Sequence, residues 1–287
     1  MSSDSKRSEI RRILVALDAS PHSEAALEAA AELAHRAGAE LLGLYVEDIN
    51  LLRLAQLPFA QEVGQFTAIR RQLDVREVER QIRGQTVRVR RMLEVTTRRT
   101  RLRWSFEVTR GTVVGEVLRA ASDVDALVLG RSGWSLVAPG RMGSTARAVL
   151  APEAASPMPG LCLIVPSGGC LGAPFMVIYD GSALAERALD IAAELMREDE
   201  QPLIVLLLAE HRERLEPLVA QVQAWLGERD LELRYVTLSA ISVPDLVNTL
   251  HTERCGTLVL PSRSDVLDAE ALQAVMDQVE VPILLVR

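Results

Sequence analysis

The sequence contains few of the residues that form covalent crosslinks or metal centres. Its 287 residues include only 3 cysteines and 4 histidines, and no two cysteines have the CxxC spacing. Cys162 lies inside the apolar stretch Leu161–Val165, where a free cysteine behaves as a small buried hydrophobic residue. We therefore expect neither a disulfide framework nor a structural zinc site.

Long hydrophobic runs are absent as well. Leu203–Ala209, the longest apolar stretch, has the length of a strand and falls short of the roughly 18 residues that indicate a membrane span. Residues 1–7 are polar and lack the apolar core of a secretory signal. The apolar content of 48% and the charged content of 25% are typical of globular proteins. We expect a cytoplasmic protein with no membrane partner, long enough for two domains.

Charge is distributed unevenly along the chain. Residues 70–103 contain 12 arginines and 4 acidic residues, a local excess of +8 in a chain whose net charge is −7. Apolar or small residues recur there at helical spacing, which predicts an amphipathic helix with arginines on its solvent face. These residues are Val75, Val78, Ile82, Val89, Leu93 and Thr96. A nucleic-acid partner is the alternative, but no aromatic residues interleave with the arginines to stack on bases.

The segment from Asn50 to Arg103 is interpreted as a long insertion between the expected strands 41–46 and 105–108. Its first part, Leu51–Phe59, is apolar enough for a lid or a partner surface, and ordinary packing over the sheet edge is the simpler interpretation.

Two parts of the chain resemble each other at an offset of 162 residues. The pattern Asp-x-Ser-x-x-x-Glu-x-Ala-Leu begins at Asp18 and again at Asp180. In both places an apolar run precedes the aspartate and an alanine-rich amphipathic stretch follows. A repeat at so large a period indicates that a whole domain has been duplicated.

Short apolar runs alternate with helical patterns in both halves. Such alternation is typical of parallel sheets that helices cover on both faces. The expected strands are 13–17, 41–46, 105–108, 126–129, 161–165, 175–179, 203–208, 231–238, 257–260 and 282–286. We predict an α/β fold of two tandem five-stranded parallel-sheet sandwiches, in residues 9–168 and 173–287.

A glycine-rich segment follows the fourth expected strand. Gly130-Arg131-Ser132-Gly133 is separated by nine residues from Gly143-Ser144-Thr145, which begins a helical stretch. The segment has neither the lysine of a Walker A loop nor the GxGxxG spacing. Glycines permit close approach and positive φ, and backbone N–H groups at the start of a helix attract anions. These features favour phosphate binding, with a simple turn and helix cap as the alternative.

Asp18 ends the first expected strand, as Gly130 ends the fourth. If the two strands are neighbours, the crevice at their carboxyl ends holds a nucleotide, because ligands of such sheets bind where the strand order reverses. Asp18 then faces either ribose hydroxyls or a phosphate-bound cation.

Together these features resemble the universal stress protein family in its tandem-domain form. ATP-binding members of that family carry G-x2-G-x9-G-(S/T), which Gly130, Gly133, Gly143 and Ser144 match. The resemblance implies a Rossmann-like fold of the adenine-nucleotide α-hydrolase type and an ATP site, with Asp18 as the candidate ligand of an accompanying Mg²⁺. The site residues that it implies are Ala16, Leu17, Asp18, Ser20, Val46, Gly111, Gly130, Arg131, Ser132, Gly133, Gly143, Ser144 and Thr145.

The second half lacks this motif. Pro261 stands where alignment of the halves puts Gly130, and no glycine follows it. Asp265, Asp268 and Glu270 would repel a triphosphate. We therefore expect a degenerate domain without nucleotide. Since universal stress proteins commonly dimerise through their last strands, the resemblance implies that the two domains pair through strands 161–165 and 282–286 in an internal pseudo-dimer. Whether the chain forms a further homo-oligomer is left open.

No pair of nucleophile and base is evident beside the glycine segment. His22 is expected on the surface of the first helical turn, where the helix N-terminus disfavours an imidazolium ion. The first hypothesis is therefore an ATP-binding regulatory protein of the stress response, with at most slow hydrolysis. The alternatives are a nucleotide-free interaction module, and an adenylyl-transferring or hydrolysing enzyme of the same superfamily.

Overall fold

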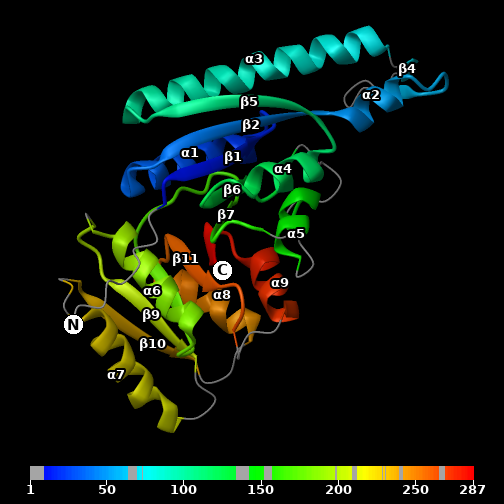
Figure 1. Ribbon diagram of the computed structural model, residues 1–287. Helices are drawn as coiled ribbons and strands as arrows, with labels where there is room; N and C mark the ends of the chain where they lie inside the picture. The colour runs from blue at the N-terminus through cyan, green and yellow to red at the C-terminus, as the bar shows by residue number, and fades with distance from the viewer. Residues whose placement is uncertain are drawn as a thin grey trace.

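The computed structural model describes residues 10–63, 70–72, 74–133, 142–151, 157–197, 199–208, 212–227, 229, 231–238, 242–264 and 269–287. Strands alternate with helices along the chain, which confirms the α/β class (Figure 1). The strands are β1 (Arg12–Leu17), β2 (Glu40–Asp48), β3 (Gln61–Val63), β4 (Arg70–Gln72), β5 (Trp104–Gly111), β6 (Ala126–Gly130), β7 (Leu161–Val165), β8 (Phe175–Tyr179), β9 (Leu203–Leu208), β10 (Leu233–Leu238), β11 (Thr257–Pro261) and β12 (Ile283–Val286). The helices are α1 (Pro21–Ala37), α2 (Ile49–Ala55), α3 (Val75–Thr100), α4 (Val113–Ala121), α5 (Ser144–Leu150), α6 (Ala183–Leu195), α7 (Leu215–Leu226), α8 (Val243–Thr252), α9 (Ala269–Gln278) and the short 3-10 helix η1 (Arg212–Arg214).

The two halves share one continuous sheet of ten described strands, in the order β10-β9-β8-β11-β12-β7-β6-β1-β2-β5. From the centre outward, the first half contributes β7, β6, β1, β2 and β5, and the second half contributes the corresponding strands β12, β11, β8, β9 and β10. Pairing is parallel within each half and antiparallel at the centre, where Cys162 of β7 lies opposite Leu285 of β12. This confirms the predicted pairing of 161–165 with 282–286. The small antiparallel hairpin of β3 and β4 was not predicted.

Helices cover both faces of this sheet and form two hydrophobic cores. One core contains buried residues of α1, α3, α6 and α7, and the other contains residues of α4, α5, α8 and α9. Alternate strand residues face opposite cores, as Ile13 and Val15 face the first and Leu14 the second. Because both faces are buried, the strands are apolar throughout, which is the pattern from which the sheet was predicted. Among the described residues, no helix combines the length and apolarity of a transmembrane span.

Helix α3 has the predicted amphipathic character. Figure 1 shows it along the β5 and β2 edge of the sheet, at the end of the molecule opposite β10 and α7. It packs closely because Gly43 of β2 has no side chain, and a Cβ there would lie 2.7 Å from Cδ2 of Leu93. Its buried stripe ends at Thr97 rather than the predicted Thr96, because a step of four from Leu93 keeps to one helical face. On the exposed side, arginines pair with glutamates of the same helix, as Arg90 does with Glu94 at 3.4 Å.

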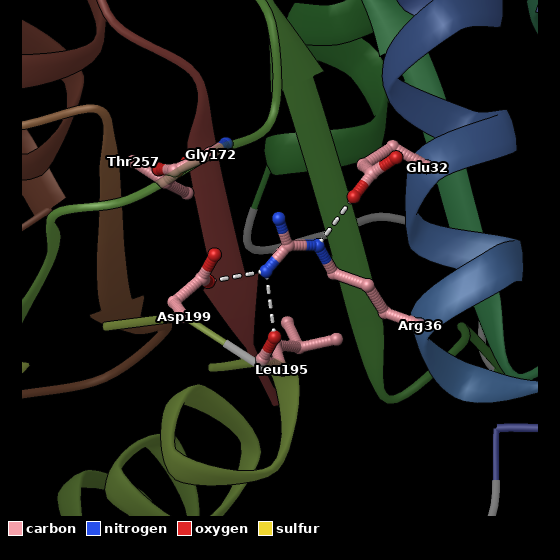
Figure 2. Close-up of polar contacts among 6 residues, drawn as sticks. All are labelled: Glu32, Arg36, Gly172, Leu195, Asp199 and Thr257. Atoms are coloured by element: carbon pink, nitrogen blue, oxygen red, sulfur yellow. Dashed lines mark hydrogen bonds and ion pairs between the residues drawn. The ribbon is translucent and has the colours of Figure 1, made fainter. Parts of the chain in front are cut away.

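A polar contact joins the helices α1 and α6 of the two halves (Figure 2). Nη1 of Arg36, near the end of α1, donates to the Leu195 carbonyl at 2.8 Å and to Oδ2 of Asp199 at 2.5 Å. Its Nε donates to Glu32 at 2.6 Å, which orients the guanidinium. Because the side chain is largely buried, this contact is less screened than a surface ion pair.

The reactivity of the cysteine thiols tests whether the strands of the sheet are buried. Cys162 and Cys255 are buried, and burial raises the pKa of each thiol to about 12, whereas Cys170 is exposed. Since the thiolate is the reactive form, we expect a thiol reagent to titrate Cys170 rapidly in the native chain and all 3 cysteines after unfolding. Rapid labelling of Cys162 in the native state, read by peptide mass spectrometry, would contradict the central strand pairing.

Candidate functional site

A cavity of about 440 Å³ lies at the carboxyl ends of β1, β2 and β6. Strands β1 and β6 are parallel neighbours, with Ile13 opposite Ala126, as the crevice predicted from the sequence requires. The chain leaves β1 toward β2 on one side and reaches β6 on the other, so the cavity is at the switch in strand order where α/β sheets bind ligands.

Most of the predicted site residues line this cavity. They are Ala16, Leu17, Asp18, Val46, Gly130, Ser132, Gly133, Gly143, Ser144 and Thr145. The remaining three, Ser20, Gly111 and Arg131, are not among the lining residues. Between Gly133 and Gly143, residues 134–141 lie outside the described part of the chain.

Asp18 is held in place by the turn that begins α1. Its Oδ1 accepts a hydrogen bond from the Ser20 N–H at 2.9 Å, and its own N–H donates to Oγ of Ser23 at 3.0 Å. Oγ of Ser20 caps the helix by accepting from the Ser23 N–H. Ser20 is thus a buried capping residue, which explains why it does not reach the cavity. The turn requires a left-handed residue, and Ala19 adopts φ +60°.

The glycines of the motif are needed for space. A Cβ at Gly133 would lie 2.7 Å from Oδ2 of Asp18, and one at Gly130 would lie 2.9 Å from the carbonyl oxygen of His22. Neither glycine has a positive φ, so the expectation of left-handed backbone was wrong. Any side chain at these positions would collide with the wall of the cavity or fill it.

The cavity has both apolar and polar lining residues. Leu44, Val46, Val113 and Val117 form an apolar region around the ends of β2 and α4. The other end contains Asp18, the glycine segment and the hydroxyl-bearing residues that begin α5. The N–H of Gly143 already donates to the Arg131 carbonyl at 2.7 Å, so it closes the loop and is not available to a ligand.

Several lining residues were not predicted. They are Ser23, Leu44, Asp48, Asn50, Thr112, Val113, Val114, Val117, Leu129 and Ala146. Asp48 is the last residue of β2 and Asn50 follows two residues later, so the rule that sites form at the carboxyl ends of strands would have found them. Gly111 is the last residue of β5 and pairs with Asp48, and the chain enters the cavity wall one residue later, at Thr112.

Arg131 is directed away from the cavity. Its guanidinium is buried and donates through Nη1 to the Val279 carbonyl, at 2.8 Å, in the second half of the chain. The part of Arg131 that these contacts leave for a ligand is therefore not its guanidinium, and its binding of nucleotide stays a prediction.

His22 also differs from its prediction. Its Nε2 lies 2.9 Å from Oγ of Ser132, so the imidazole packs against the glycine segment instead of facing solvent. Burial lowers the pKa of His22, and the nearby Asp18 carboxylate only partly opposes this, so the ring is neutral at pH 7. Among the described residues, no cluster of three or more histidine, cysteine or acidic side chains could hold a metal ion.

At the matching position of the second half, a serine side chain faces the aspartate. Asp180 accepts from the Ser182 N–H at 2.9 Å, as Asp18 does from Ser20. The residue that aligns with Gly133 is Ser264, and its Oγ lies 2.5 Å from Oδ2 of Asp180. A side chain thus occupies the space that Gly133 leaves open in the first half. Asp265 and Asp268 lie outside the described residues.

The fold is that of a Rossmann-like α/β protein with two similar halves, and the cavity lies at the strand switch of the first half. The family model of the universal stress protein family matches residues 9–152, half of the 287-residue chain, and the chain belongs to this family.

Two solved structures share the whole architecture. A universal stress protein from Archaeoglobus fulgidus DSM 4304 is 15% identical, with a TM-score of 0.71 over 96% of this chain and 98% of that one. A putative universal stress protein from Pseudomonas aeruginosa UCBPP-PA14 is 13% identical, with a TM-score of 0.55 over 97% of this chain and 94% of that one. At these identities the likeness shows the fold. A search of curated proteins found no match.

The lowered pKa of His22 predicts how stability depends on pH. In the unfolded chain this residue takes up a proton near the ordinary histidine pKa of 6.5, whereas in the folded chain it does so only at lower pH. The free energy of unfolding should therefore fall as pH is lowered from about 7.5 to about 5.5. Urea unfolding of His22→Gln should show a smaller decrease than the wild type, whereas His251→Gln, at an exposed position of α8, should follow the wild type. An unchanged pH dependence in His22→Gln would contradict the proposed burial of a neutral ring.

Proposed function

We propose that this chain is an ATP-binding regulatory protein of the stress response, with one nucleotide site in residues 9–168 and a degenerate second domain in residues 173–287. The observation that carries the proposal is that residues distant in sequence meet in one cavity. Asp18, Val46 and the four residues of G-x2-G-x9-G-(S/T) all line it.

The shape and polarity of the cavity suit an adenine nucleotide. Its volume of about 440 Å³ is within the range of roughly 300–1,000 Å³ that is usual for small-molecule sites. The apolar region around Val46 suits a planar base, and the end formed by the glycine segment suits phosphates, since it has hydroxyls and no bulky side chain. Asp18 and Asp48 are the carboxylates near that space, and Mg²⁺ in nucleotide sites is bound through one or two carboxylates plus phosphate oxygens. Asp18 is therefore the residue that would hold such an ion.

The contact between Ser132 and His22 favours a second candidate, an enzyme that turns the nucleotide over. A hydroxyl 2.9 Å from a neutral imidazole is the usual arrangement of a nucleophile or water-positioning group and its base. No third group that orients the imidazole is established among the described contacts, so regulatory binding remains the first proposal. Release of ADP that depends on His22 would favour the enzyme.

Calorimetric titration with ATP and Mg²⁺ tests the number of sites. We expect one site per chain, because Ser264 closes the matching position of the second half over Asp180. Two equivalent sites would contradict the degenerate character of that domain. If neither ATP nor another adenine nucleotide binds at millimolar concentrations, the proposal is refuted.

Substitution of Gly133 tests where the nucleotide binds. In Gly133→Val the new Cβ would lie 2.7 Å from Oδ2 of Asp18, so we expect the loss of measurable ATP binding with the fold intact. Gly84→Val is the matched control, since Gly84 is exposed on α3 and a Cβ there has nothing within 4 Å. Circular dichroism and thermal unfolding monitor the fold of both variants. Unchanged affinity in Gly133→Val would show that ATP binds elsewhere on the chain and would contradict the proposed site.

A further inference from the structure

Arg131 lies in the middle of the glycine segment, and its side chain crosses into the second half. Its Nη1 donates to the Val279 carbonyl at 2.8 Å, and its Nη2 donates to the Asp277 carbonyl. These carbonyls are in the last turn of α9 and just beyond it. The last carbonyls of a helix lack partners within the helix and carry partial negative charge, so a buried guanidinium is a fitting donor for them. Only 8% of Arg131 is exposed, so water competes little for these bonds.

The backbone of Arg131 is fixed as well. Its N–H donates to the Val165 carbonyl of β7 at 2.7 Å, and its carbonyl accepts from the N–H of Gly143 at 2.7 Å. One residue therefore connects the first part of the motif to its third glycine, to the central strand of the sheet and to α9. Ser132 and Gly133, which line the cavity, are the next residues along the chain.

The equivalent position of the second half makes no such connection. Alignment of β6 with β11 places Ser262 where Arg131 stands, and the Ser262 N–H donates to the Val286 carbonyl just as the Arg131 N–H does to Val165. A serine has no cationic side chain that could extend to the opposite half. The second half contacts the first from another position, because Nη2 of Arg287, the residue after β12, donates to the Val149 carbonyl near the end of α5. The duplicated backbone geometry is thus preserved in both halves, and the arginine within the glycine segment is particular to the first.

We propose that Arg131 is a positioning residue of the nucleotide site: it holds the glycine segment against the end of α9, so that the second half sets the affinity of the first for ATP. This inference rests on the proposed function of the cavity. Coupling between two sites is reciprocal, so ATP bound in the first half also stabilises the end of α9. The second domain, although closed to nucleotide, then has a defined role in nucleotide binding.

Arg36 offers a matched control. It also joins the halves by donating to a main-chain carbonyl at the end of a helix, that of Leu195 in α6, and it also is largely buried. Arg36 lies near the C-terminal end of α1, whereas Asp18 precedes the N-terminal end of this helix. Arg36 is not among the residues that line the cavity. Loss of Arg36 therefore weakens the contact between the halves without touching the glycine segment.

The experiment compares ATP affinity in the full chain and in Arg131→Ala, Arg131→Lys and Arg36→Ala by calorimetric titration. We expect Arg131→Ala to weaken binding about tenfold, within the range usual for energetic coupling between sites. Arg131→Lys should recover part of this loss, because lysine keeps a cation that can donate to one of the carbonyls. Arg36→Ala should bind like the wild type even if its thermal unfolding temperature falls.

Hydrogen exchange gives a second readout, which in the wild type needs no variant: ATP should slow amide exchange at residues 277–281. At saturating ATP this protection should persist in Arg36→Ala, be lost in Arg131→Ala and be partly retained in Arg131→Lys. If Arg131→Ala fails to fold, the wild type and Arg131→Lys alone decide.

The outcomes separate the two proposals. A wild type without ATP binding overturns the proposed function. A wild type that binds ATP, with Arg131→Ala of equal affinity, overturns the positioning role alone. Equal weakening in Arg131→Ala and Arg36→Ala would show a general loosening of the halves, and wild-type binding without protection of residues 277–281 would show that α9 is not coupled to the site. Both results would also overturn the inference.

Discussion

The antiparallel pairing of β7 with β12 is the interaction on which the rest of the architecture depends. Each half ends on its fifth strand, and pairing of these two strands joins two parallel half-sheets into one sheet and leaves neither fifth strand as an exposed edge. The contact of Arg36 with Asp199 and that of Arg131 with the end of α9 both require this arrangement, because it brings α1 close to α6 and the loop after β6 close to α9.

Duplication of the fold does not impose duplication of the site. Asp18 and Asp180 accept equivalent backbone hydrogen bonds, so the turn after the first strand of each half is the same. The difference lies in the side chain that faces the aspartate. Gly133 leaves open space above Asp18, whereas Ser264 places its hydroxyl on Asp180. The two halves thus differ in the side chain beside the aspartate, while the backbone geometry of the turn is retained.

The insertion between β2 and β5 adds charge on a helix that lines no described part of the cavity. The arginines of α3 face solvent and several pair with glutamates one turn away, so the local positive charge is spread over an exposed helix face. Of the described residues of the insertion, Asn50 in the first turn of α2 lines the cavity. The polar groups around the glycine segment therefore come from the common α/β scaffold, and the insertion contributes a wall.

Local spacing in the sequence was enough to predict the ten strands of the large sheet, their alternation with helices, the repeat and the lining role of Gly133 and Gly143, because strand alternation, helical periodicity and motif spacing involve residues that are near one another along the chain. The direction of individual side chains depends instead on partners brought close by folding. Arg131 reads locally as part of a phosphate loop, but its partner Val279 is 148 residues away, and His22 contacts Ser132 across 110 residues. The single sheet likewise arises from a pairing between the ends of the two halves. The sequence alone therefore determined which segments form the site, and only the tertiary structure decided which of their side chains face the ligand cavity and which hold the two halves together.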